Sequence, residues 1–327
     1  MKSARPWRAC TSKPRPRSLS PASLLFYLSL SFPVSLAPHA WADVIAAMGA
    51  KEIRASRTLV GAVQTVKTER VLFVNPPGEP DTWIEDERIL TAIAQYGMNG
   101  ELAERTEYAP DGAAMVRVVR QYNRAHKLST EHLYNSQGTL WRKTSHTYDE
   151  AGRLTQAVST DVDGDLWFRD VYTYTADGRP AHIDHHDPDG TFLHRASFSY
   201  DGEGRVAKRS LSDADGSPIS SNTYVYDAEE RVQSVITHGR SGALTSRWVY
   251  AYDAHGNERE WVASDRDGAI QRKEVYTYEY DGHGNWVKQV TAEWIPDDDE
   301  GYLEPAEATY RTITYHPQGG IGDKEGL

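Results

Sequence analysis

Apolar and polar residues alternate along most of this chain, in segments of about 8 to 10 residues separated by short polar turns. Alternation with a period of two predicts half-buried β-strands rather than helices. A tyrosine that closes every second segment recurs at a constant step of 26 residues, at positions 96, 122, 148, 174, 200, 226 and 252. A turn glycine keeps the same step, at positions 112, 138, 164, 190, 216, 242 and 268. Two independent features, the tyrosine and the turn glycine, that recur with the same period indicate a tandem repeat.

Each repeat contains two strands and two turns. One turn reads Tyr-Asp-x-x-Gly, as at residues 200–204, and the other reads Asp-x-Asp-Gly, as at residues 213–216. The final glycine suits the positive φ that tight hairpin turns need. His126 and Glu230 stand where that glycine belongs, so we expect strained turns at both positions. Because the connections are too short for a crossover helix, neighbouring strands must be antiparallel.

The predicted fold is all-β. Tandem antiparallel β-hairpin repeats are expected to form an elongated, twisted or curled sheet over residues 59–315, with an atypical first repeat. Residues 43–58 are expected to be a capping segment or short helix, because Asp43 can cap a helix and an apolar patch follows it, made of Val44, Ile45, Ala47 and Met48. Residues 316–327 are expected to form a flexible, glycine-rich tail.

The alternation also predicts one aromatic face. Counted from the turn glycine, positions +2, +8 and +10 are mostly apolar and are expected to share one side, while +4 and +6 on that side are polar. This pattern favours a thin or hollow arrangement over a densely packed sandwich. An open sheet would offer this face to an extended partner or a second copy, whereas a curled sheet would bury it. The candidate ligand-binding face comprises Tyr172, Tyr174, Phe198, Tyr200, Tyr224, Tyr226, Tyr250 and Tyr252.

The first 42 residues have the features of a secretory signal peptide. A basic region precedes an apolar segment from Leu24 to Leu36, and Ala40-Trp41-Ala42 supplies a small-x-small cleavage site. The apolar run is shorter than the roughly 20 residues that a membrane anchor needs. We therefore expect an exported protein, either periplasmic or secreted, with no membrane insertion after cleavage.

Charge and cysteine content restrict the binding partners and the disulfide bonds that the protein can have. Cleavage after Ala42 leaves 285 residues with no cysteine, so disulfides are excluded. The same 285 residues hold 30 basic and 47 acidic side chains, a net charge of −17 with histidine neutral. Nucleic acid and anionic membranes require a basic footprint, so we expect neither as a partner.

One motif connects the repeat to a known family. A Gly-x…-Arg-x-Tyr-x-Tyr-Asp-x-x-Gly-Arg pattern is nearly matched twice, by Gly164, Arg169, Tyr172, Tyr174, Gly178 and Arg179 and by Gly242, Arg247, Tyr250, Tyr252, Asp253 and Gly256. The chain resembles the RHS/YD-repeat family over about residues 90 to 290, as a short exported YD-repeat protein without a toxin domain. That resemblance implies a strip of antiparallel hairpins, which in the family winds into a shell around a toxin cargo or serves in surface attachment.

Two groups of side chains could hold a metal ion. Asp161, Asp163 and Asp165 have oxygen-ligand spacing suited to calcium, although the recurrence of Asp-x-Asp-Gly favours turn chemistry. Histidines concentrate on one predicted hairpin, where a transition metal would need three or four convergent ligands and solvated strand residues are the alternative. This group comprises His182, Asp184, His185, His186 and His194.

We expect no catalytic, cofactor or metal site. No nucleophile elbow, zinc-protease helix, phosphate loop or dinucleotide fingerprint occurs in the sequence. The leading hypothesis is a non-enzymatic binding or cell-envelope interaction module with a glycan or an envelope protein as partner. The alternatives are a carbohydrate-active or metal-dependent enzyme, and an orphan shell fragment of an RHS-type toxin system.

Overall fold

The computed structural model describes residues 59–79, 82–297 and 301–317, which form strands and turns. The predicted signal peptide 1–42, the capping segment 43–58 and most of the tail 316–327 lie outside the described residues. Within the described part of the chain, no helix is long and apolar enough to cross a membrane.

Nineteen strands follow one another in the described residues, and every strand except β2 has neighbours on both sides. They are β1 (Val63–Val74), β2 (Ile84–Glu85), β3 (Ile89–Tyr96), β4 (Leu102–Tyr108), β5 (Ala114–Tyr122), β6 (Leu128–Tyr134), β7 (Leu140–Tyr148), β8 (Leu154–Thr160), β9 (Leu166–Tyr174), β10 (Pro180–His186), β11 (Phe192–Tyr200), β12 (Val206–Asp213), β13 (Pro218–Tyr226), β14 (Val232–His238), β15 (Leu244–Tyr252), β16 (Glu258–Asp265), β17 (Ile270–Tyr280), β18 (Trp286–Ile295) and β19 (Tyr302–Tyr315).

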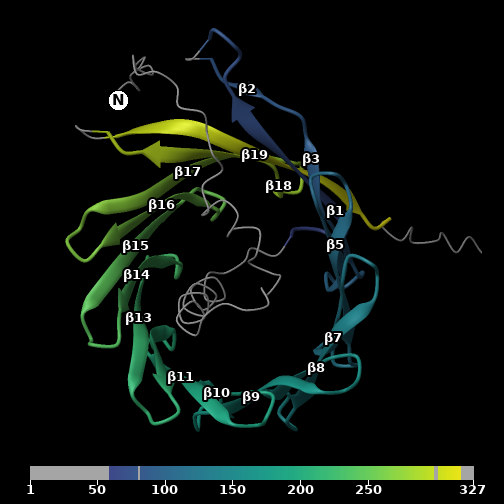
Figure 1. Ribbon diagram of the computed structural model, residues 1–327, viewed down its shortest axis with the longest axis vertical. Helices are drawn as coiled ribbons and strands as arrows, with labels where there is room; N and C mark the ends of the chain where they lie inside the picture. The colour runs from purple at the N-terminus through teal and green to yellow at the C-terminus, as the bar shows by residue number, and fades with distance from the viewer. Residues whose placement is uncertain (1–58, 80–81, 298–300, 318–327) are drawn as a thin grey trace, which may run out of the picture.

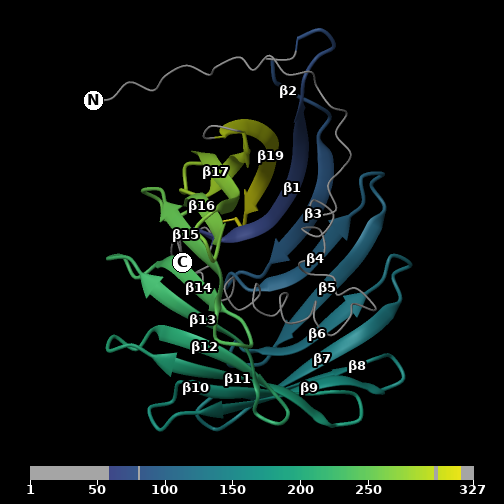
Figure 2. The same ribbon diagram turned by 60° about the vertical axis from the view of Figure 1, so that its left-hand side comes forward.

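The sheet is a closed ring, and the predicted elongated sheet is therefore wrong. β1 pairs antiparallel with β3 on one side and with β19 on the other, and the second pairing runs from Val63 opposite Tyr315 to Leu72 opposite Glu307. Figure 1 shows the strands following one another around a single ring, and Figure 2 shows their common tilt. Strand twist accumulates in one direction, and repeated bulges increase it, so a long series of identical hairpins bends back on itself.

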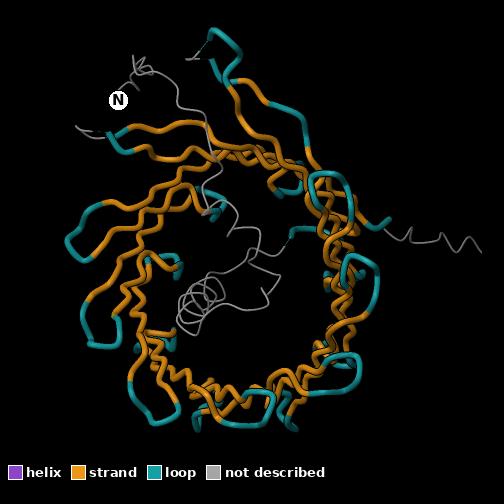
Figure 3. Tube along the Cα trace, viewed as in Figure 1, coloured by secondary structure: helices purple, strands orange, loops and turns teal. Residues whose placement is uncertain are grey.

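Both kinds of turn have the same backbone geometry. At residues 149–153, the amide of Gly152 donates to the carbonyl of Asp149 at 2.8 Å, and the amide of Asp149 donates to the carbonyl of Arg153 at 2.9 Å. The last turn position has positive φ throughout, including φ 58° at His126 and 62° at Glu230. These are the two non-glycine residues with positive φ among the residues described, which confirms the predicted strain. Figure 3 shows that loops occur where strands end.

A bulge at each hairpin shifts the alternation near the turns. Between β8 and β9, Thr160 lies opposite Leu166 but Ser159 lies opposite Phe168, which leaves Trp167 as an extra residue. Directly opposite residues share a face, and successive residues of one strand do not. Leu166, at position +2, therefore does not share the face of Phe168, and the prediction for position +2 is wrong.

One face of the sheet points into the ring. Cross-strand pairs join Tyr224 to Val235, Val235 to Trp248 and Trp248 to Ala263, so these side chains share a side. Tyr224, Val235 and Ala263 are 5%, 2% and 6% exposed, whereas Val225, on the opposite side of β13, is 42% exposed. We call the buried side the inner wall.

The ring is fastened where its first and last strands meet. Val71 and Ala308 lie opposite each other and are 1% and 0% exposed. The short strand β2 pairs with the end of β1. Its Glu85 accepts a hydrogen bond from the Tyr310 hydroxyl at 2.5 Å and forms an ion pair with Lys288 at 3.1 Å. β2 thus links β1 to both β18 and β19 across the closure.

Candidate functional site: the inner wall of the ring

The eight residues predicted to bind a ligand form two rows. The rim row consists of the tyrosines that end β9, β11, β13 and β15, and the inner row lies two residues earlier on each strand, so both rows face the same side. The rim row is Tyr174, Tyr200, Tyr226 and Tyr252, and the inner row is Tyr172, Phe198, Tyr224 and Tyr250.

The rim row holds neighbouring hairpins together. The Tyr226 hydroxyl donates to the carbonyl of Val206 at 2.9 Å, and the guanidinium of Arg205 lies 4.6 Å from the ring centroid of Tyr226. Arg205 is itself paired with the turn residue Asp201 at 2.8 Å. Equivalent tyrosine-to-carbonyl bonds and arginine–ring contacts recur at Tyr174, Tyr200 and Tyr252. These rings already have a cation and a carbonyl as partners, which indicates a structural role.

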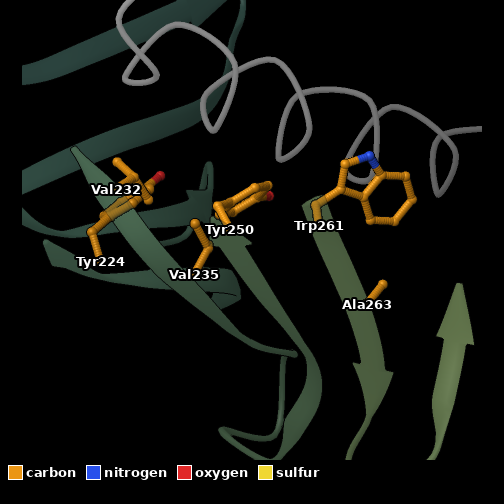
Figure 4. Close-up of a cluster of buried hydrophobic side chains, with 6 residues drawn as sticks. All are labelled: Tyr224, Val232, Val235, Tyr250, Trp261 and Ala263. Atoms are coloured by element: carbon orange, nitrogen blue, oxygen red, sulfur yellow. The ribbon is translucent and has the colours of Figure 1, made fainter. Parts of the chain in front are cut away.

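The inner row divides into a covered part and a partly exposed part. Tyr224 and Tyr250 are 5% and 4% exposed, and they pack in a cluster with Val232, Val235, Trp261 and Ala263. Figure 4 shows these six side chains on one side of their strands. Tyr172 and Phe198 are only partly buried. The open aromatic face that one alternative predicted is therefore absent at Tyr224 and Tyr250.

Hydrogen-bonding side chains lie beside Tyr172 and Phe198. Asp170 stands two residues before Tyr172 on β9, and its carboxylate is 2.6 Å from the Nδ1 atom of His185 on β10. The His185 ring stacks on His194 of β11, with centroids 4.6 Å apart and planes at 19°. We call Phe168, Asp170, Tyr172, His185, His194 and Phe198 the inner patch.

The inner patch combines three chemical properties. Phe168 packs on His185 with ring centroids 5.5 Å apart, which adds an aromatic wall to the histidine stack. Burial, with the nearby His185, lowers the pKa of His194 to about 4, so His194 is uncharged at neutral pH. A neutral imidazole can both donate and accept a hydrogen bond. The patch therefore offers flat apolar rings, a carboxylate and, at His194, a neutral donor–acceptor group on one surface.

The side chains of the histidine-rich hairpin, which were one of two candidate metal-ligand groups, do not converge on one point. Asp184 pairs with Arg195 at 2.6 Å, and His182 contacts the Ser197 hydroxyl at 3.0 Å, whereas His185 and His194 belong to the inner wall. In the turn at 161–165, one carboxylate oxygen of Asp161 accepts the amides of Asp163 and Asp165. The described residues contain no group of three or more histidine, cysteine or acidic side chains that could hold a metal ion.

A second polar group on the inner wall has no motif in the sequence. Trp261 donates its indole N–H to the Tyr276 hydroxyl at 2.6 Å, and this hydroxyl donates to Glu274, which also pairs with Arg272 at 2.6 Å. Burial, with the neighbouring Glu274 carboxylate, raises the pKa of Tyr276 far above its ordinary value. All four residues keep the 26-residue phase of the repeat, so no irregularity of spacing marks them.

Burial also raises the pKa of a carboxyl group near the closure of the ring. Glu307 on β19 lies 3.3 Å from Arg70 on β1. Desolvation nevertheless raises the pKa of the Glu307 carboxyl, and the carboxylates of Glu274 and Glu293 act in the same direction.

Comparisons with known proteins identify no family for this chain. No protein-family model matches it, and no curated protein matches it. A crystallised porin-like protein from Bacteroides uniformis is 13% identical, with 78% of this chain and 99% of that chain covered and a TM-score of 0.41. A chain in a TcdB2-TccC3-Cdc42 crystal structure is 12% identical, with 76% and 16% covered and a TM-score of 0.22.

A putative outer membrane lipoprotein-sorting protein domain from Vibrio parahaemolyticus is also similar. It is 11% identical, with 85% of this chain and 92% of that chain covered and a TM-score of 0.22. At TM-scores this low, none of the three likenesses carries an argument about function.

Proposed function

We propose that this protein is an exported, non-enzymatic binding module of the cell envelope and that it holds a glycan chain against the inner patch. The observation that carries the proposal is the juxtaposition of Tyr172 and Phe198 with the Asp170–His185–His194 array on one partly exposed wall. Binding sites typically combine apolar and aromatic lining with a few placed polar groups. Sugar rings present both C–H faces and hydroxyl groups, which match such a surface.

The net negative charge and the signal-like N-terminal segment support the proposed class of partner and the proposed export. A net charge of −17 after residue 42 favours a neutral or cationic partner over nucleic acid or an anionic membrane. The basic and apolar leader supports export to the periplasm or the exterior. On the motif alone, we also assign the chain to the RHS/YD-repeat family, in which surface attachment is one of the roles of such hairpins.

A glycan array combined with pull-down from envelope extract tests the proposal. Tyr172→Leu and Phe198→Leu remove the aromatic faces but keep apolar volume, and we expect each to weaken binding at least tenfold. Thr173→Leu, on the opposite face of β9, is the matched control and should bind as the parent does. The proposal fails if no glycan is retained, if only a protein is captured, or if Thr173→Leu weakens binding equally.

A further inference from the structure

We infer that Arg311 forms a second binding site on the inner wall and that this site holds the carboxylate group of an organic monoanion. Arg311 belongs to β19, which Figure 1 shows on the opposite side of the ring from β9, β10 and β11. The inference is independent of the glycan proposal, because it uses no residue of the inner patch.

The pairing of the strands places Arg311 on the inner wall. Tyr278 on β17 shares its side of the strand with Tyr276, which belongs to the inner wall. Tyr278 lies opposite Gln289 on β18, and Gln289 lies opposite Thr309 on β19. Directly opposite residues share a face. Arg311 follows Thr309 by two residues and therefore also faces the interior of the ring.

Arg311 carries a charge that no carboxylate balances. In the described part of the chain its guanidinium forms no ion pair, and its buried Nε atom has no hydrogen-bond partner. Burial lowers the pKa of Arg311 to about 10, and the nearby Arg105 acts in the same direction, so the guanidinium is still charged at neutral pH. A desolvated charge without a counter-charge is unfavourable for the fold. A negatively charged ligand would supply the missing partner.

The nearby inner-wall carboxylates pair with other arginines. Glu107 lies 3.3 Å from Arg105, and Glu307 lies 3.3 Å from Arg70. Arg105 is thereby balanced, so the site has one positive charge in excess, at Arg311. Charges much farther away than about 8 Å are largely screened at physiological ionic strength, so the net negative charge of the chain does not govern this site. One excess positive charge suits a monoanion such as a carboxylate better than a phosphate dianion.

The aromatic neighbours of Arg311 favour an organic carboxylate. The guanidinium carbon lies 3.4 Å from the ring centroid of Trp286, and the rings of Trp286 and Tyr278 are 6.0 Å apart. Stacking on a ring holds the plane of the guanidinium, whose N–H groups then match the two oxygens of a carboxylate. The apolar part of an organic acid would lie against the two rings.

Isothermal titration calorimetry of the full chain with glucuronate tests the inference, and glucuronamide is the uncharged probe of the same shape. We expect the parent to bind glucuronate but not glucuronamide, and Arg311→Met to bind glucuronate at least about tenfold more weakly. Arg117→Met is the matched control and should bind as the parent does. The Arg117 guanidinium also lies over a ring, 4.1 Å from the centroid of Tyr134, but it pairs with Glu104 at 3.4 Å on the outer face of the sheet.

Thermal melts separate a lost site from a lost fold. Without ligand, Arg311→Met should melt no lower than the parent, because it removes a charge that the fold does not balance. Glucuronate should raise the melting temperature of the parent and of Arg117→Met but not that of Arg311→Met.

Three binding results would overturn the inference even if the glycan proposal holds: no binding of glucuronate, equal binding of glucuronamide, or equal affinity of the parent and Arg311→Met. A lower melting temperature of Arg311→Met without ligand would also overturn it, because the guanidinium would then have a stabilising partner within the chain.

Discussion

Equivalent turns of this chain hold either glycine or a larger residue at the position with positive φ, so the cost of backbone strain can be measured within one protein. Glu230 has φ 62°, whereas Gly178 occupies the same turn position with φ 84°. A side chain in this left-handed region costs about 1–2 kcal/mol, and replacing glycine by alanine returns about 0.4–1 kcal/mol by restricting the unfolded chain. The net advantage of glycine at such a position is therefore about 0.5–1 kcal/mol.

Two comparisons isolate this strain from side-chain contacts. Glu230→Ala removes the carboxylate and keeps the Cβ atom, so Glu230→Gly should be more stable than Glu230→Ala by about 0.5–1 kcal/mol. Parent Gly178 should exceed Gly178→Ala by a similar amount, because an added Cβ would meet nothing closer than Arg153 Nη1 at 3.8 Å. Urea unfolding measures both differences. Alanine variants as stable as glycine at both positions would refute the argument from positive φ.

Two further predictions concern the inner face. Tyr252→Phe removes the hydroxyl that donates to the Val232 carbonyl at 2.7 Å and keeps the ring under Arg231. Urea unfolding should therefore show that the free energy of unfolding falls by about 1 kcal/mol. An unchanged free energy of unfolding would contradict the structural role of the rim row. Glu307 has a raised pKa in the folded chain, so its contribution to stability is present at low pH and is lost as pH rises through that raised value. Glu307→Gln should therefore gain stability relative to the parent between pH 4.5 and pH 7, and equal pH profiles would show that burial does not govern this carboxyl.

Much of the architecture could be predicted from the sequence because the repeat is in phase. The tyrosines from 122 to 252 end strands, the turn glycines have positive φ, and all neighbouring strands are antiparallel. His126 and Glu230 were identified as strained because their neighbours in the repeat are glycine. Local chemistry determines each of these features.

Closure could not be predicted in the same way. A tandem pattern defines one hairpin and its neighbour, whereas closure depends on the small bend that each hairpin adds and on the sum of all bends. The bulges that contribute to this bend, such as the one at Trp167, recur once in every repeat and therefore leave the 26-residue period unchanged. The pairing of β1 with β19 joins residues more than 230 positions apart, and neither strand belongs to a regular repeat.

The candidate site was predicted in part. The alternation placed Tyr172 and Phe198 on one face and the histidines on one hairpin, but it could not show that β10 brings His185 to Asp170 while Asp184 turns to Arg195. The division between rim and inner rows also depends on three-dimensional contacts, since the carbonyl that each rim tyrosine meets lies 20 residues earlier. Binding by either row stays a prediction.

The closed ring is tested most directly by a disulfide across its closure. Lys67 on β1 lies opposite Thr312 on β19, and directly opposite residues have Cα atoms about 4.5–5.5 Å apart, within the range that a disulfide spans. In the full chain with Cys10→Ser, Lys67→Cys with Thr312→Cys should oxidise to an intrachain disulfide in the dilute monomer, and Lys67→Cys with Thr173→Cys on β9 should not. If the first pair stays reduced or forms only dimers, β1 and β19 are not neighbours in one chain, and the sheet is open.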